Sequence, residues 1–123
     1  MKHLLLTTIA AVLLVGCGKE EIDRTLIAAI AGGDIEAVKQ HLADGVDVNA
    51  KNKVGGTLLH FAALEGRKEI AELLIAKGGD VNVKTKDGLT PLDRAIKYQR
   101  TETVDLLRKH GGKTGEELKA EGK

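Results

Sequence analysis

Several residue types that carry chemistry are missing from this sequence or nearly so. Its 123 residues contain no serine, which removes the commonest nucleophile of hydrolases. The single cysteine, Cys17, excludes a disulfide within the chain. None of the four histidines stands at metal-ligand spacing from a cysteine or from a carboxylate cluster. We therefore expect no catalytic site, no metal site and no cofactor.

Aromatic residues and net charge are also scarce. Phe61 and Tyr98 are the only aromatics, so a core must come from Leu, Ile, Val and Ala, which suit small, closely packed helices. Lys and Arg total 19 and Asp and Glu total 18, which leaves a net charge of +1. This balance gives no strong field for nucleic acid, and no known reading motif is present, so we expect no nucleic-acid partner. The length fits a single domain.

The start of the chain has the features of an export signal. Lys2 and His3 precede residues 4–15, which are apolar except for two threonines. This run has the length of a signal peptide, whereas spanning a bilayer takes about 20 residues. It ends in Leu14-Val15-Gly16-Cys17, which resembles the lipobox of bacterial lipoproteins. The alternatives are an ordinary secretory signal with a chance cysteine, or a buried helix.

The lipobox resemblance implies how the mature chain is held. Residues 1–16 would be removed, and Cys17 would become the lipidated N-terminus, followed by a short tether over residues 17–21. Several acyl chains on one residue anchor a protein stably, where a single chain is marginal. An aspartate after the cysteine usually retains such proteins at the inner membrane, so Gly18 favours the outer membrane, facing the periplasm.

The remaining sequence repeats with a period of 33 residues. Residues 45–49, GVDVN, recur as GGDVN at residues 78–82. The same shift maps Leu26 onto Leu59 and Leu92 without any insertion. A fixed period of this size indicates stacked supersecondary units, each of which leaves a face for its neighbour to cover.

Each unit has the pattern of two short helices. In the middle unit, two apolar faces at helical spacing flank Gly66, and Gly78 ends the second helix as a C-terminal cap. The two faces consist of Leu59, Ala62 and Ala63, and of Ile70, Leu73 and Leu74. In the third unit, Asp87-Gly88 predicts a tight turn, and Pro91 stands where a helix begins.

These motifs resemble the ankyrin repeat. Residues 57–63, TLLHFAA, and residues 88–92, GLTPL, are similar to the family motif G-x-T-P-L-H-x-A-A. Leu58 replaces the motif proline and Asp93 replaces its histidine, although Asp93 can still accept a hydrogen bond near a helix start. By this resemblance His60 has a structural role, with its ring hydrogen-bonded to neighbouring loops.

The resemblance covers residues 22–112 and implies the architecture. We expect an all-α solenoid of three stacked ankyrin repeats with β-hairpin loops, at about residues 22–51, 52–84 and 85–112. The first and third units carry more polar residues and would serve as caps. A polar tail follows over residues 113–123. Thr114 and Glu117 in that tail have capping-box spacing, which leaves a short helix and a frayed end as open alternatives.

The same resemblance implies where a partner binds. The family's partner-reading positions fall here on Lys51, Lys53, Val54, Gly56, Leu64 and Glu65 in the middle unit, and on Lys84, Lys86, Asp87, Leu89, Lys97 and Tyr98 in the third. Four of them are tip lysines, a basic row in an otherwise neutral chain. Leu64, Leu89 and Tyr98 are apolar residues at positions that the repeat leaves exposed. We expect Leu89 and Tyr98 to form one binding cluster in the third unit, assisted by the tip lysines.

Among these positions Tyr98 is the strongest candidate, because aromatic anchors often dominate interfaces. The alternative is that the lysines only solvate loops and that Tyr98 packs against the tail. We expect a monomeric, non-catalytic interaction module of the bacterial envelope, tethered to the membrane and with an unknown protein partner. The competing hypothesis is a structural or stress-protective envelope protein without a specific partner.

The lipobox resemblance generates the first prediction. Cys17→Ala removes the only thiol that could receive lipid, so the variant is expected in the soluble or precursor fraction without bound fatty acid. Metabolic labelling with a radioactive fatty acid and flotation with membranes measure both properties. A variant that still floats and still incorporates the label would contradict a lipid anchor at Cys17.

Overall fold

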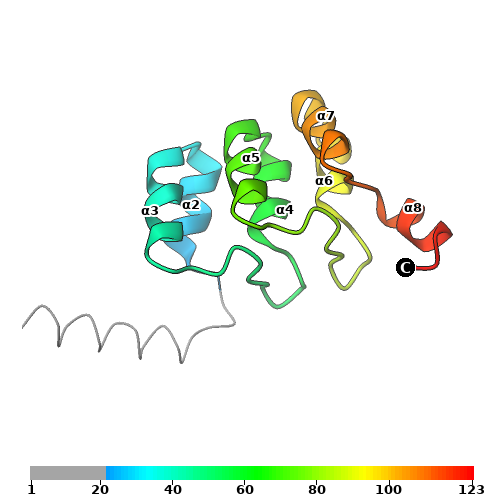
Figure 1. Cartoon of the computed structure of the whole chain (residues 1–123), viewed down its shortest axis with the longest axis horizontal. Coiled ribbons are helices and arrows are strands. Elements are labelled where there is room, and N and C mark those ends of the chain that lie inside the picture. The colour runs from blue at the N-terminus through cyan, green and yellow to red at the C-terminus, as the bar shows by residue number, and fades with distance from the viewer. Residues whose placement is uncertain (1–21) are drawn as a thin grey trace, which may run out of the picture.

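The computed structural model describes residues 22–123, so the expected signal peptide and Cys17 lie outside the described part. Three antiparallel helix pairs stack side by side, and a short helix follows them (Figure 1). The helices are α2 (Arg24–Gly32), α3 (Ile35–Ala43), α4 (Leu58–Glu65), α5 (Lys68–Ala76), α6 (Pro91–Lys97), α7 (Thr101–Lys109) and α8 (Gly115–Ala120). Residues 22–123 contain no strand, and the predicted all-α repeat class is confirmed.

The loops between the pairs are tight turns. In the second unit the Asn52 N–H donates to the Gly56 carbonyl at 2.9 Å, and in the third the Thr85 N–H donates to the Leu89 carbonyl at 2.9 Å. The loops expected as β-hairpins, residues 44–57 and 77–90, therefore contain turns but no strand. Gly55 has a φ of 84°, and a Cβ on it would lie 3.2 Å from the Thr85 Cα, so glycine lets the two turns lie against each other.

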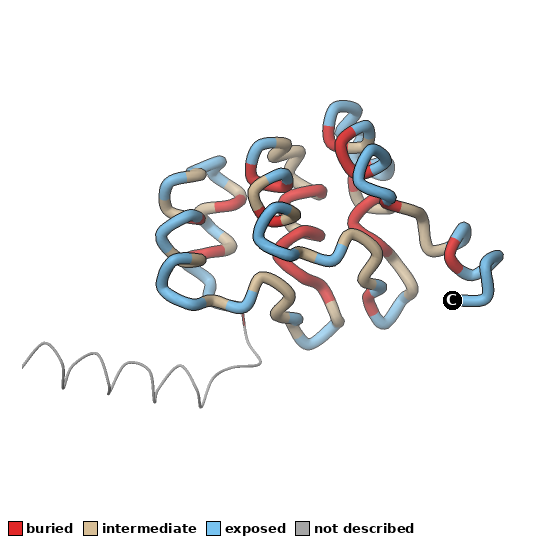
Figure 2. The backbone as a smooth tube through the Cα atoms, viewed as in Figure 1, coloured by how far each residue is buried: buried red, intermediate tan, exposed pale blue. Residues whose placement is uncertain are grey.

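The core runs through the stack between the helix pairs (Figure 2). The central helix α4 packs against α2 on one side and α6 on the other. Ala62, Ala63 and Ala95 are fully buried, and their small side chains let the first helices of adjacent units approach closely. Aliphatic residues at recurring positions fill the remaining space, among them Leu26, Leu59, Leu74, Leu92 and Leu107.

Two polar links recur with the period of the sequence. The first is an asparagine after the second helix of the first and second repeats: the Asn49 side chain donates to the Gly78 carbonyl at 3.0 Å and accepts the Asp80 N–H at 2.8 Å. One period later Asn82 makes the same pair of bonds, at 3.1 and 2.8 Å, to Gly111 and Lys113. The recurring asparagine thus satisfies backbone groups at both junctions between repeats.

The second link is an arginine that reaches back to the preceding repeat. Arg67 donates to the Ala31 carbonyl, and Arg100 Nε donates to the Leu64 carbonyl at 2.9 Å. Each arginine side chain packs over a glycine, Arg67 over Gly33 and Arg100 over Gly66. A Cβ on Gly66 would lie 2.7 Å from the Arg100 Cδ. At the same position the third repeat has Gln99, with a φ of 57°.

The packing of the central repeat generates a stability prediction. Leu74 is fully buried between repeats, so Leu74→Ala removes its packing and leaves a cavity, at an expected loss of about 2–5 kcal/mol in the free energy of unfolding. Urea denaturation followed by circular dichroism measures this loss. Leu73→Ala, at a neighbouring position that is only half-buried, is the matched control and is expected to lose less. Equal midpoints for parent and Leu74→Ala would contradict the assigned helix face.

Candidate protein-binding surface

The structure divides the predicted binding residues into two groups. The first group lies on the turns, and the second lies at the opposite end of the first helices. The turn group contains Lys51, Lys53, Val54, Gly56, Lys84, Lys86, Asp87 and Leu89, and the helix-end group contains Leu64, Glu65, Lys97 and Tyr98. Helix α6 separates Leu89 from Tyr98, and at 1.5 Å per residue its length is about 10 Å. Leu89 and Tyr98 therefore do not form one cluster.

The helix-end group is built around Tyr98. Its side chain is 43% exposed, which contradicts the alternative that it packs against the tail. Lys97 Nζ lies 5.6 Å from the centre of the Tyr98 ring, within the range of a cation–π contact. The Arg100 bond to the Leu64 carbonyl holds the connection between α6 and α7 against the end of α4. Residues from two adjacent repeats thus form one surface.

Ile96 adds apolar surface next to this group, although it is not one of the binding residues predicted from the sequence. It is 46% exposed, whereas Ile30 and Ala63, at the same position of the first two repeats, are fully buried. The position faces the following repeat, and no fourth helix pair covers it among residues 22–123. An isoleucine at the inter-repeat position of a last unit is the sequence signal that would have found it.

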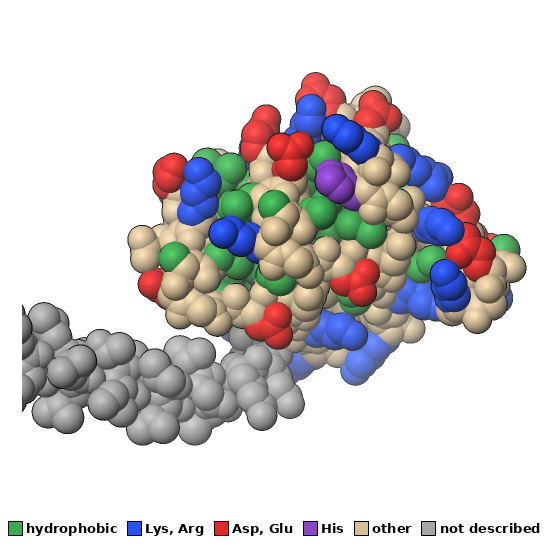
Figure 3. Space-filling model, in the orientation of Figure 1, with side chains coloured by type: hydrophobic (Ala, Val, Ile, Leu, Met, Phe, Trp, Pro, Cys, Tyr) green, Lys and Arg blue, Asp and Glu red, His purple; other side chains and the backbone are tan. Residues whose placement is uncertain are grey.

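The four lysines on the turns, Lys51, Lys53, Lys84 and Lys86, are all exposed, and we call them the tip row. The backbone N–H of Lys86 donates to the Val54 carbonyl at 2.9 Å, which places the two turns side by side. Val54 itself is 54% exposed. Figure 3 shows Lys and Arg side chains along the lower edge of the molecule, where Figure 1 shows the turns.

Leu64 and Leu89 are half-buried instead of exposed. For Leu89 the cause is its backbone, which is drawn into the fold: the carbonyl accepts from His60 Nε2 at 2.9 Å, and the N–H donates to Thr85 Oγ1 at 3.2 Å. For Leu64 the Arg100 side chain lies against its carbonyl. Tyr98 and Val54 are therefore the more accessible apolar side chains among the predicted positions.

Two shallow hollows border the tip row. One, of about 320 Å³, lies between the second turn and the start of the first repeat, and its walls include Ile22, Asn52, Lys53 and Val54. The other, of about 380 Å³, lies between the third turn and α8.

Within the described residues no group of His, Cys, Asp and Glu could hold a metal ion. None of the helices in this part of the chain is long and apolar enough to cross a membrane.

His60 holds the second and third repeats together. Its Nδ1 accepts the Thr57 N–H at 3.1 Å, so the neutral ring carries its proton on Nε2 and donates it to the Leu89 carbonyl. Burial lowers the pKa of His60, because a charged ring would lose hydration there, and the bond to Leu89 offsets part of this effect. The structural role expected for His60 is confirmed.

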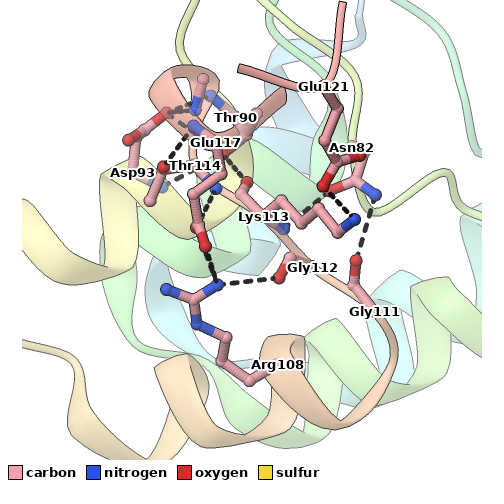
Figure 4. Close-up of polar contacts among 11 residues, drawn as sticks. Asn82, Thr90, Asp93, Arg108, Gly111, Gly112, Lys113, Thr114, Glu117 and Glu121 are labelled. Carbon is pink, nitrogen blue, oxygen red and sulfur yellow. Dashed lines mark hydrogen bonds and ion pairs between the residues drawn. The ribbon is translucent and has the colours of Figure 1, made fainter. Parts of the chain in front are cut away.

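Asp93 occupies the position of His60 in the third repeat and preserves the helix cap. Its Oδ2 accepts the Thr90 N–H at 2.9 Å, as the sequence analysis expected. The same oxygen accepts the Gly115 N–H at 2.8 Å, so that Asp93 binds the start of α8 (Figure 4). A Cβ on Gly115 would lie 1.9 Å from the Gly88 carbonyl oxygen, so only glycine allows this approach.

The tail is a helix that is attached to the third repeat, not a frayed end. Arg108 pairs with Glu117 at 2.8 Å, and Lys113 pairs with Glu121 (Figure 4). The Thr114 backbone and the Arg108 guanidinium lower the pKa of Glu117. Leu118 is 5% exposed. Because residues 115–120 lie one period after residues 82–87, α8 replaces the turn of a further repeat.

Three stacked helix pairs with linked turns define a solenoid repeat protein. A family model described as ankyrin repeats (3 copies) matches residues 26–117, and the chain belongs to the ankyrin-repeat family. Repeats of this family form protein-interaction modules and are typically non-catalytic.

The curated relatives match this chain over only part of its length. Over 48 residues the chain is 44% identical to myotrophin of Xenopus laevis, which covers 39% of this chain and 41% of that protein. It is 38% identical over 53 residues to myotrophin of Xenopus tropicalis, covering 43% and 45%. It is 40% identical over 58 residues to serine/threonine-protein kinase 12 of Arabidopsis thaliana, covering 46% of this chain and 13% of the kinase. The chain thus spans less than half the length of the relatives it matches.

The environment of His60 generates a pH prediction. Its pKa is lowered in the folded state, so the unfolded chain binds more protons near the ordinary value of about 6.5. The stability contributed by the neutral ring is full above that value and is lost as the pH falls through the folded pKa. Urea midpoints between pH 7.5 and 5 are expected to fall for the parent and to flatten for His60→Gln.

The control for this prediction is His110→Gln, at an exposed position, which is expected to keep the pH dependence of the parent. An unchanged pH dependence in His60→Gln would show that another group causes the loss of stability at acidic pH.

Proposed function

We propose that this chain is a protein-interaction module of the bacterial envelope, held to the outer membrane through lipid on Cys17 and facing the periplasm. The membrane attachment is supported by the lipobox-like residues 14–17 and by the twelve-residue apolar run before them. The interaction role is supported by one observation above all: a three-repeat stack leaves apolar side chains accessible at the end of its third repeat.

The helix-end group is the proposed contact with the partner. Tyr98 offers a large amphipathic ring at little cost in conformational entropy, and Ile96 adds an aliphatic side chain on the same helix end. Lys97, next to the ring, and Arg100 supply donors for carboxylates at the rim of an interface. We expect a protein partner with an apolar pocket bordered by acidic residues.

The proposed contact generates a prediction on binding. Tyr98→Ala is expected to weaken capture of the partner by about 1–3 kcal/mol, because the ring is the anchor of the surface. It should leave the fold intact, since the side chain is outside the core. Cross-linking in intact cells identifies the partner, and binding kinetics on the purified pair measure the loss.

Lys109→Ala, at an exposed position on α7, is the matched control and should bind as the parent does. Equal affinity of parent and Tyr98→Ala would move the contact to another face of the stack. If the parent captures no protein reproducibly, the protective role without a specific partner is the better hypothesis.

A further inference from the structure

We propose that the tip row rests on anionic phospholipid headgroups of the membrane that carries the chain. The turns would then face the bilayer, and the helix-end group would point away from it. This inference rests on the proposed anchor at Cys17, and it assigns the four lysines to lipid instead of to the protein partner.

The first argument is the length of the tether. Only residues 18–21 separate Cys17 from Ile22, the first described residue. An extended chain spans at most about 3.6 Å per residue, so Ile22 lies within about 18 Å of an anchored Cys17. The start of the stack is therefore held close to the headgroups, whichever way the stack is turned.

The second argument is the side on which the chain enters the fold. Ile22 lines the same hollow as Asn52, Lys53 and Val54, so the second turn is next to the point of entry. The bond from the Lys86 N–H to the Val54 carbonyl keeps the third turn alongside it. In Figure 1 the start of α2, where the described part of the chain begins, lies on the side of the turns. The tip row is thus on the side that the tether holds near the membrane.

The third argument is the distribution of charge. Residues 51–54 and 84–88 contain four lysines and one acidic residue, Asp87, whereas the sequence as a whole has a net charge of only +1. The tether contains Lys19 beside Glu20 and Glu21, so its net charge is −1 and the attraction must come from the turns. Charges are screened within about 8 Å at physiological salt, so only the side against the headgroups contributes. Of the four lysines, Lys84 also donates through Nζ to the Lys123 carbonyl at 2.8 Å. Each lysine that lies against the headgroups strengthens association about fivefold.

This orientation has a consequence for the proposed function. The helix-end group lies at the other end of α6 from the tip row, so Tyr98 is turned toward the aqueous space. A partner in that space could then reach the ring without displacing the protein from the membrane.

The test uses the single thiol of the chain. The chain from Cys17 to Lys123 contains every described residue, and coupling Cys17 to a maleimide phospholipid anchors it without native lipidation. Vesicles of phosphatidylcholine alone are compared with vesicles that contain phosphatidylglycerol. Brief acylation of lysines, quantified by mass spectrometry, reports the accessibility of each amine. Lys39 and Lys97, which are exposed on other parts of the stack, are internal controls.

We expect tip-row acylation to slow at least threefold on the anionic vesicles, with Lys39 and Lys97 unchanged and the difference abolished at high salt. Lys53→Glu with Lys86→Glu should remove the protection of Lys51, whereas Lys39→Glu with Lys97→Glu, the same change of charge elsewhere, should retain it. Equal tip-row labelling on both vesicles, or protection that survives Lys53→Glu with Lys86→Glu, overturns the inference. Because the coupling is synthetic, this outcome is independent of whether cells lipidate Cys17.

Discussion

The structure depends on contact between neighbouring helix pairs. A single pair of seven- to nine-residue helices has apolar side chains on both sides and cannot cover them alone. The central helix α4 is covered on both sides, by α2 and by α6. Its small side chains Ala62 and Ala63 allow the backbones of these helices to approach closely. The asparagine and arginine links are subordinate to this packing. They satisfy backbone groups at the edges of an interface that hydrophobic burial creates.

Each end of the described stack has one apolar face that no neighbouring helix pair covers. At the C-terminal end α8 takes the place of a further turn, and Asp93, Arg108 and Lys113 bind it. The cover is incomplete, because α8 lies near the turns and leaves Ile96 exposed at the far end of α6. The same incompleteness produces the apolar surface next to Tyr98, so that the cap and the proposed partner contact share one repeat.

Much of this could be predicted from the sequence because the repeat is encoded locally. The 33-residue period, the cap at Thr90 and Asp93, and the role of His60 each follow from side chains within a few residues or one period. The sequence left the tail undecided between helix and frayed end, because its attachment depends on Gly115 approaching Gly88, 27 positions away in the chain. It also grouped Leu89 with Tyr98, because a motif position does not show that a whole helix lies between two residues.

The arginine link has a consequence for how copies of this chain can meet. Joining two copies head to tail would place Asp34, which stands where Arg67 and Arg100 stand in the later repeats, next to the Lys97 carbonyl. Two acceptors would then face each other, and the Gln99 side chain would fill the space over which a guanidinium packs elsewhere. Open-ended filaments arise when a surface is complementary to the opposite end of its own molecule. At this junction the chain lacks both halves of that complementarity, which disfavours open-ended, head-to-tail assembly of its copies.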